Sequence, residues 1–224
     1  MPSRAELGKI MLLFGLSCLL WLSVALFYGR EVATGLLPML RWEIAQLAPH
    51  YEIRDLSVAH AGGETAIVVS VTTAYPQLYG ARSLPADVSM SSSTLLGHLL
   101  QPLVVMWSLI STAALLRRQR ALPLVLFAIP AAVAVVMLDV PFVLVGALED
   151  LVLSTGLPSD AYRSPWVIWM NLLNGGGRLA LGIGAALVVI AIAPGLTACP
   201  DRRLVLPSSK RRISSAVGKR RSWQ

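Results

Sequence analysis

The most regular feature of the chain is a set of four long apolar runs separated by polar residues. The runs cover residues 10–27, 95–116, 121–142 and 172–196, and ionisable side chains are rare within them. A run of about 20 apolar residues forms a helix that crosses the hydrocarbon core of a bilayer, which is roughly 30 Å thick. The pattern therefore predicts an α-helical integral membrane protein with about four transmembrane helices, the first preceded by a short segment of residues 1–9.

The first run has two interpretations. Arg4 and Lys9 precede it, and Ser23-Val24-Ala25 resembles a signal-peptidase site, as in a secretory leader. Its apolar stretch is longer than the 7–15 residues of a usual signal-peptide core, however. We expect a retained membrane anchor, with cleavage as the alternative.

The longest polar segment, residues 28–94, predicts a small α+β module between the first two spans. Residues 39–47 have helical apolar spacing and are followed by Pro49. Residues 51–58 and 66–73 alternate or are rich in β-branched side chains, with turn residues between them, which is typical of a β-hairpin. Such a segment is small for a core of its own, so we expect it to rest on the membrane or on another protein.

The ends of the module and the stretch after the third span are less clearly patterned. A third short strand is expected at residues 87–90, and residues 91–94, a Ser-Ser-Ser-Thr run, are expected to cap the second span. Residues 140–153 stay apolar around Pro141. They form either an interfacial helix or an extension of a tilted span, within an expected extracytoplasmic loop at about 143–171.

The positive charges are distributed unevenly, and this predicts the orientation. Residues 1–9, 117–120 and 197–224 hold 13 of the 19 lysines and arginines, whereas residues 28–94 and the loop after the third span are rich in acids. Cytoplasmic loops of membrane proteins carry the excess of lysine and arginine. We therefore expect a multi-pass protein of the cell inner membrane with both termini in the cytoplasm.

The location of the basic residues, more than the net charge of +7, indicates which partner they bind. The basic tail, residues 197–224, follows directly on a span, so its expected partner is the anionic headgroups of membrane lipids. A nucleic-acid partner is not expected.

Six polar side chains are expected at one depth, near the outer edge of the hydrocarbon. Asp139 and Arg178 each lie 18 residues, about 27 Å, from the cytoplasmic end of their span. His98 and Gln101 begin the second span, and Asn171 and Asn174 begin the fourth. His98, Asp139 and Arg178 are candidate catalytic residues, and Gln101, Asn171 and Asn174 are candidate binding residues. The alternatives are a structural ion pair between helices, or polar groups that simply face lipid headgroups.

Small residues near the start of the fourth span are typical of close helix packing in lipid. They are Gly177, Ala180, Gly182, Gly184 and Ala186. The run Asn174–Arg178 is not a phosphate loop, because no strand precedes it and no Gly-Lys-Ser/Thr follows.

Other chemistry has little support in the sequence. There is no Gly-x-Ser-x-Gly or His-Glu-x-x-His motif, no metal-ligand spacing and no cofactor signature. The chain is therefore not expected to bind a metal or a cofactor.

Three stretches resemble the small membrane proteins that accompany exosortases, the bacterial enzymes that process C-terminal sorting signals. They are residues 91–98, residues 138–141 and residues 169–178, within the layout of one span, a β-containing insert and three further spans. The chain departs from the exosortases themselves, which resemble cysteine transpeptidases, because Cys18 and Cys199 lack the matching neighbours. The resemblance implies an accessory role.

Three functions follow as hypotheses, in this order. The first is a non-enzymatic accessory or assembly subunit that binds a larger membrane protein, and the resemblance suggests an exosortase-type sorting system. The second is a membrane enzyme acting on a lipid or peptide at the outer interface through His98, Asp139 and Arg178. The third is a small transporter or channel component, which would need polar groups through the full depth of the spans.

Overall fold

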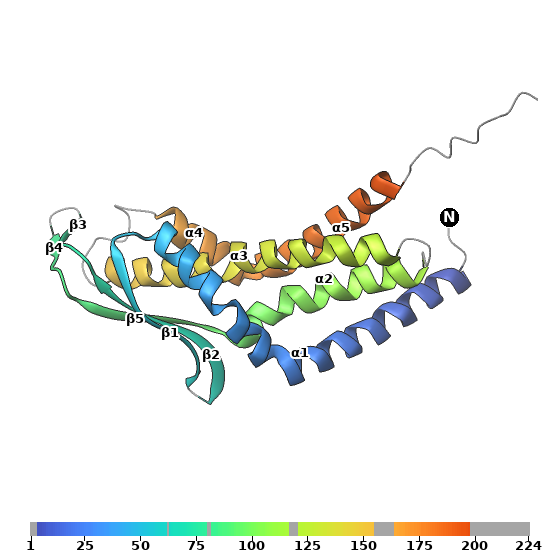
Figure 1. The fold of residues 1–224 in the computed structure, drawn as a ribbon, viewed down its shortest axis with the longest axis horizontal. Helices are drawn as coiled ribbons and strands as arrows, with labels where there is room; N and C mark the ends of the chain where they lie inside the picture. The colour runs from blue at the N-terminus through green and yellow to red at the C-terminus, as the bar shows by residue number, and fades with distance from the viewer. Residues whose placement is uncertain (1–3, 62, 80–81, 117–120, 155–163, 198–224) are drawn as a thin grey trace, which may run out of the picture.

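The computed structural model describes residues 4–61, 63–79, 82–116, 121–154 and 164–197. It consists of a bundle of long helices with a small β-sheet at one end (Figure 1). The helices are α1 (Arg4–Leu47), α2 (Leu96–Leu116), α3 (Ala121–Ser154), α4 (Pro165–Leu172) and α5 (Arg178–Thr197), with a π-helical turn, η2 (Leu173–Gly177), between the last two. The strands are β1 (Tyr51–Ala61), β2 (Glu64–Thr73), β3 (Gln77–Tyr79), β4 (Arg82–Leu84) and β5 (Ser89–Leu95).

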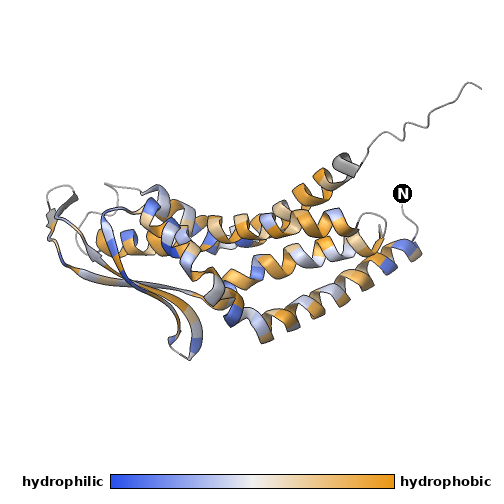
Figure 2. Cartoon of the chain, in the orientation of Figure 1, coloured by the Kyte–Doolittle hydropathy of each residue, from blue (hydrophilic) through white to orange (hydrophobic). Residues whose placement is uncertain are grey.

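Four helical segments are long and apolar enough to cross a membrane, as the sequence predicts. They are α1, α2, α3 and the segment Pro165–Ala193. Their apolar residues run along the bundle, whereas polar residues are more frequent at its ends and in the sheet (Figure 2). The fold therefore fits a helical multi-pass membrane protein.

The helix α1 is much longer than the first apolar run. Its 44 residues extend about 66 Å, twice the thickness of a hydrocarbon core. The sequence separates a span at 10–27 from a second helix at 39–47, but the structure joins them, with Pro38 inside the helix. The helix changes direction between its two halves (Figure 1). Residues 28–47 of the expected module are therefore a continuation of the first helix, which ends at Leu47, before Pro49.

The sheet has the order β1-β2-β5 and is antiparallel throughout. The expected hairpin is present as β1 and β2, joined by a tight turn in which Gly63 has a φ of +88°. Along β2, Ile67, Val69 and Val71 alternate onto one buried face, as the two-residue period of a strand requires.

The expectation that residues 91–94 cap the second span is wrong. These residues lie in β5 and pair with Ser70, Val69, Val68 and Ile67 of β2. The third strand consequently begins at Ser89 and continues to Leu95, directly before the first residue of α2. Pairing with β2 satisfies the backbone groups of residues 91–94 themselves.

Residues 140–153 belong to α3, which continues without a break to Ser154, as expected for an extension of the third span. The helices α3 and α4 occupy most of the range 143–171 among the residues described, so the segment expected as an extracytoplasmic loop is largely helical. The C-terminal half of α3 packs into one apolar core with α1 and the sheet. That core includes Leu40 and Ile44 of α1, Ile67, Val69 and Val71 of β2, and Val140, Leu144 and Leu148 of α3. The small module thus completes its core with the protein's own third helix.

The helix α4 begins at a well-formed N-cap. The Ser164 hydroxyl accepts a hydrogen bond from Trp166 N at 3.2 Å, and Pro165 occupies the first turn, where its missing N–H costs nothing. The same hydroxyl donates to the Glu149 carboxylate of α3. The fourth span consequently begins before residue 172, at Pro165.

Both ends of the helical bundle can be followed in Figure 1. The N-terminal end of α1, the C-terminal end of α2, the N-terminal end of α3 and the C-terminal end of α5 lie at one end of the molecule, and the sheet lies at the other. The basic residues Arg4 and Lys9 are therefore at the end opposite the sheet.

Candidate functional site

The two ionisable residues that the sequence places at one depth form a buried ion pair. Arg178, the first residue of α5, donates from Nε to Asp139 Oδ1 at 2.9 Å and to Oδ2 at 3.1 Å. Asp139 lies midway along α3, and the two residues are only 1% and 4% exposed, in that order. The Nη1 atom of Arg178 donates to Asn174 Oδ1 at 3.0 Å, so the guanidinium is fixed on two sides.

This geometry suits a structural connection between helices. Charges in the interior of a membrane protein are costly unless they are paired. Here both carboxylate oxygens lie within hydrogen-bond distance of one Nε, and the pair ties α3 to α5. Neither group is placed to exchange protons with solvent, as a general acid or base must.

A cavity of about 330 Å³ lies beside the pair, between the start of α2 and the junction of α4 and α5. His98 and Gln101 line it from α2, and Asn174, Gly176 and Arg178 line it from the other side. Leu173 and Leu179 complete the lining. Four of the six predicted polar residues therefore share one cavity, while Asp139 lies behind Arg178.

The helix is interrupted where it passes the cavity. The turn η2 is π-helical, and Gly176 within it has a φ of +109°, a conformation that disfavours any side chain. Interruptions of this kind are frequent at functional sites in membrane helices. The three consecutive glycines 175–177 are the sequence signal for the interruption, although the sequence alone suggested only close packing.

Asn171, which the sequence grouped with the binding residues, does not line the cavity and is exposed. In a regular helix, residues 171, 174 and 178 would share one face, because they are spaced by three and four. The π-helical turn begins at Leu173, after Asn171, and Asn174 and Arg178 on either side of Gly176 still share the cavity and a hydrogen bond.

The small residues of α5 divide into two groups. Gly182 is buried against α2, where an added Cβ would lie 2.5 Å from Pro102 O, and Ala186 is fully buried. Ala180 is exposed, and an added Cβ at Gly184 would meet nothing within 4 Å. Gly177 lies before α5, at the end of η2, and an added Cβ there would lie 2.7 Å from Leu172 O.

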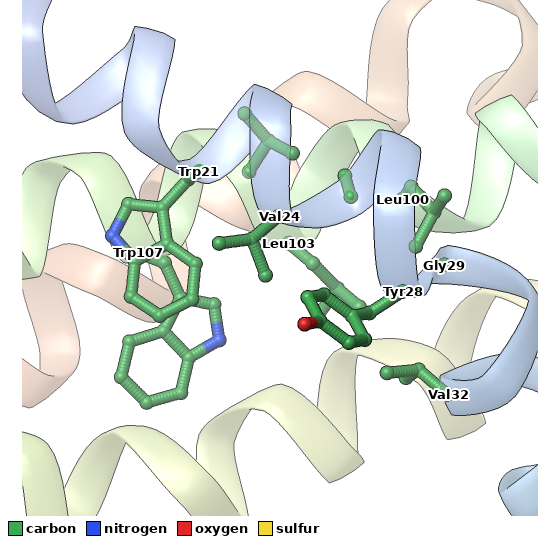
Figure 3. A pocket seen from close by; sticks show the side chains of 10 residues that line it. Trp21, Val24, Tyr28, Gly29, Val32, Leu100, Leu103 and Trp107 are labelled. Atoms are coloured by element: carbon green, nitrogen blue, oxygen red, sulfur yellow. The ribbon is translucent and has the colours of Figure 1, made fainter.

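Two contacts that the sequence did not reveal hold the first span to the second. Trp21 stacks on Trp107, with ring centroids 5.0 Å apart, and its Nε1 donates to Ser111 Oγ at 2.8 Å. Beside the stack lies a mainly apolar pocket of about 110 Å³, lined by both helices (Figure 3). Tyr28 and Leu100 border it farther along the helices.

Among the described residues outside the four long helices, one group has a pKa that burial shifts. Burial lowers the pKa of His50, which lies in the turn between α1 and β1. Its ring lies 4.2 Å from that of Tyr51. Among the described residues, no group of three His, Cys, Asp or Glu side chains is arranged to hold a metal ion.

Comparison with known proteins gives no relative. No family model, curated protein or solved structure matches the chain.

Proposed function

We propose that the chain is a non-enzymatic accessory or assembly subunit of the inner membrane, with both termini in the cytoplasm and the sheet outside. The observation that carries this proposal is the buried Asp139–Arg178 pair. Two of the three candidate catalytic groups neutralise each other at 2.9 Å, away from solvent. Within the part of the chain that the structure describes, the cavity beside them is lined by no hydroxyl, thiol or carboxylate. This supports binding rather than covalent chemistry.

The outer module supplies a surface for a partner. Trp42, on the outer half of α1, is 63% exposed, and Tyr75, after β2, is 53% exposed. Aromatic residues in such positions are typical anchors of protein interfaces. By the resemblance described above, the partner is a larger membrane enzyme of the exosortase type that processes exported proteins.

Copurification tests the partner. The tagged full-length chain, extracted from native membranes, is expected to retain one larger membrane protein in stoichiometric amount. Trp42→Ala is expected to lose that protein, whereas Gln46→Ala, one turn farther along the same exposed helix face, is expected to keep it. A solitary wild-type protein, or equal retention by the two variants, contradicts the proposal.

The orientation has a separate test. A reporter that is active only in the cytoplasm, fused after Gln224, is expected to be active. The same reporter inserted after Gly63, in the β1–β2 turn, is expected to be silent. The opposite result reverses the proposed topology.

A further inference from the structure

The cavity beside Arg178 presents hydrogen-bond donors to its interior. Among the described residues, the Arg178 guanidinium donates hydrogen bonds from Nε and Nη1. The two N–H groups of Nη2 donate to none of these residues. The oxygen of the Asn174 amide accepts from Nη1, which leaves the NH₂ group of that amide as the available donor.

The α2 side of the cavity adds two further polar groups. Gln101 contributes an amide and His98 an imidazole, which donates from whichever ring nitrogen carries the proton. The Asp139 carboxylate accepts from Nε of the guanidinium and does not line the cavity, and the Glu64 carboxylate is also close enough to interact electrostatically with His98. Because the described lining holds several donors and no carboxylate, a ligand that accepts several hydrogen bonds fits it.

The position of the cavity further limits which class of ligand it can bind. The 21 residues of α2 extend about 31 Å, close to the thickness of a hydrocarbon core, and His98 is the third of them. The cavity therefore lies at the level of lipid headgroups. Its volume of about 330 Å³ is ample for a tetrahedral anion.

We propose that this cavity binds a phosphate group, through the Arg178 guanidinium, the Asn174 and Gln101 amides and the His98 imidazole. Phosphate is favoured over carboxylate because its oxygens point in several directions, and the donors come from two separate helices. The phosphate belongs either to a phospholipid headgroup or to a free phosphate compound. Binding does not depend on the partner protein proposed above.

The test uses the full-length protein in dodecylmaltoside, a detergent without phosphate. The affinity of two probes, a short-chain phosphatidylglycerol and inorganic phosphate, is measured by their effect on thermal unfolding. Sodium chloride at matched ionic strength controls for general screening. Wild-type protein is expected to be stabilised by at least one probe: by the lipid alone if the headgroup is the ligand, and by both if phosphate suffices.

Variants separate the cavity from the basic tail, which attracts anionic lipid by itself. His98→Leu and Gln101→Leu avoid the Asp139–Arg178 pair, and each is expected to weaken binding about tenfold, the loss expected for one hydrogen bond to a charged ligand. Asn171→Leu, which alters an exposed residue outside the cavity, is expected to bind as wild type does. Absence of stabilisation by both probes, or equal binding by all three variants, overturns the proposal.

Discussion

Replacing Asp139 with alanine leaves the Arg178 guanidinium buried without its counter-ion. The two side chains are 2% and 5% exposed in the pair, so water replaces little of what is lost. Removal of one partner from a buried pair costs about 3–5 kcal/mol. We expect Asp139→Ala to lower the free energy of unfolding by that amount. Asp150→Ala, an exposed carboxylate on the same helix, is expected to change it by less than about 0.5 kcal/mol.

The reverse replacement, Arg178→Ala, is expected to cost less. A carboxylate left alone in an apolar environment can take up a proton and become neutral, whereas a guanidinium keeps its charge. The double variant Asp139→Leu/Arg178→Met removes both charges and refills the space with apolar side chains. It is expected to be close to wild type in stability, because well-packed apolar residues replace a buried ion pair at little or no cost.

Each of these four variants can be compared with the wild-type protein by titrating SDS into dodecylmaltoside micelles. Unfolding is followed by the fluorescence of the six tryptophans. The reasoning is refuted if the double variant loses as much stability as Asp139→Ala and Arg178→Ala lose together. It is also refuted if Arg178→Ala is the more destabilising single change.

Three further outcomes are expected. Gly182→Leu should lower the thermal midpoint, because a Cβ there would lie 2.5 Å from the backbone of α2. Gly184→Leu should not lower it, because an added Cβ at Gly184 meets nothing within 4 Å, and melting curves of the two variants in detergent test the difference. Trp21→Ala should cost roughly 1–2 kcal/mol in the same SDS titration, since it removes both the stack on Trp107 and a hydrogen bond between α1 and α2. Burial lowers the pKa of His50 in the folded protein, so its contribution to stability is complete above the unfolded pKa of about 6.5 and is lost as the pH falls toward the folded value. His50→Gln should therefore flatten the decline in thermal midpoint between about pH 7.5 and pH 5; an unchanged decline would assign it to other groups.

Residue spacing predicted one part of the candidate site, the common depth of its ionisable side chains. Counting residues along the spans placed Asp139 and Arg178 at one depth, because a helix rises by a fixed amount per residue. Depth does not specify which side of each helix faces its neighbour. The cavity includes Asn174 and excludes Asn171, which lies almost one turn earlier and is exposed.

The sequence by itself determined the four apolar helical segments and the β1–β2 hairpin. Both are local properties, since a long apolar run needs lipid around it, and alternating β-branched residues beside turn residues favour a hairpin. The sequence also identified the ionisable residues at one depth.

Only the tertiary structure decided where the remaining segments pack. Residues 91–94 became a strand because β2 offers them a backbone partner, and Val140, Leu144 and Leu148 continue α3 because the sheet and α1 cover them. Such contacts join residues far apart in the chain. Their free energy depends on which surfaces the folded chain brings together, and local pattern carries no information about that.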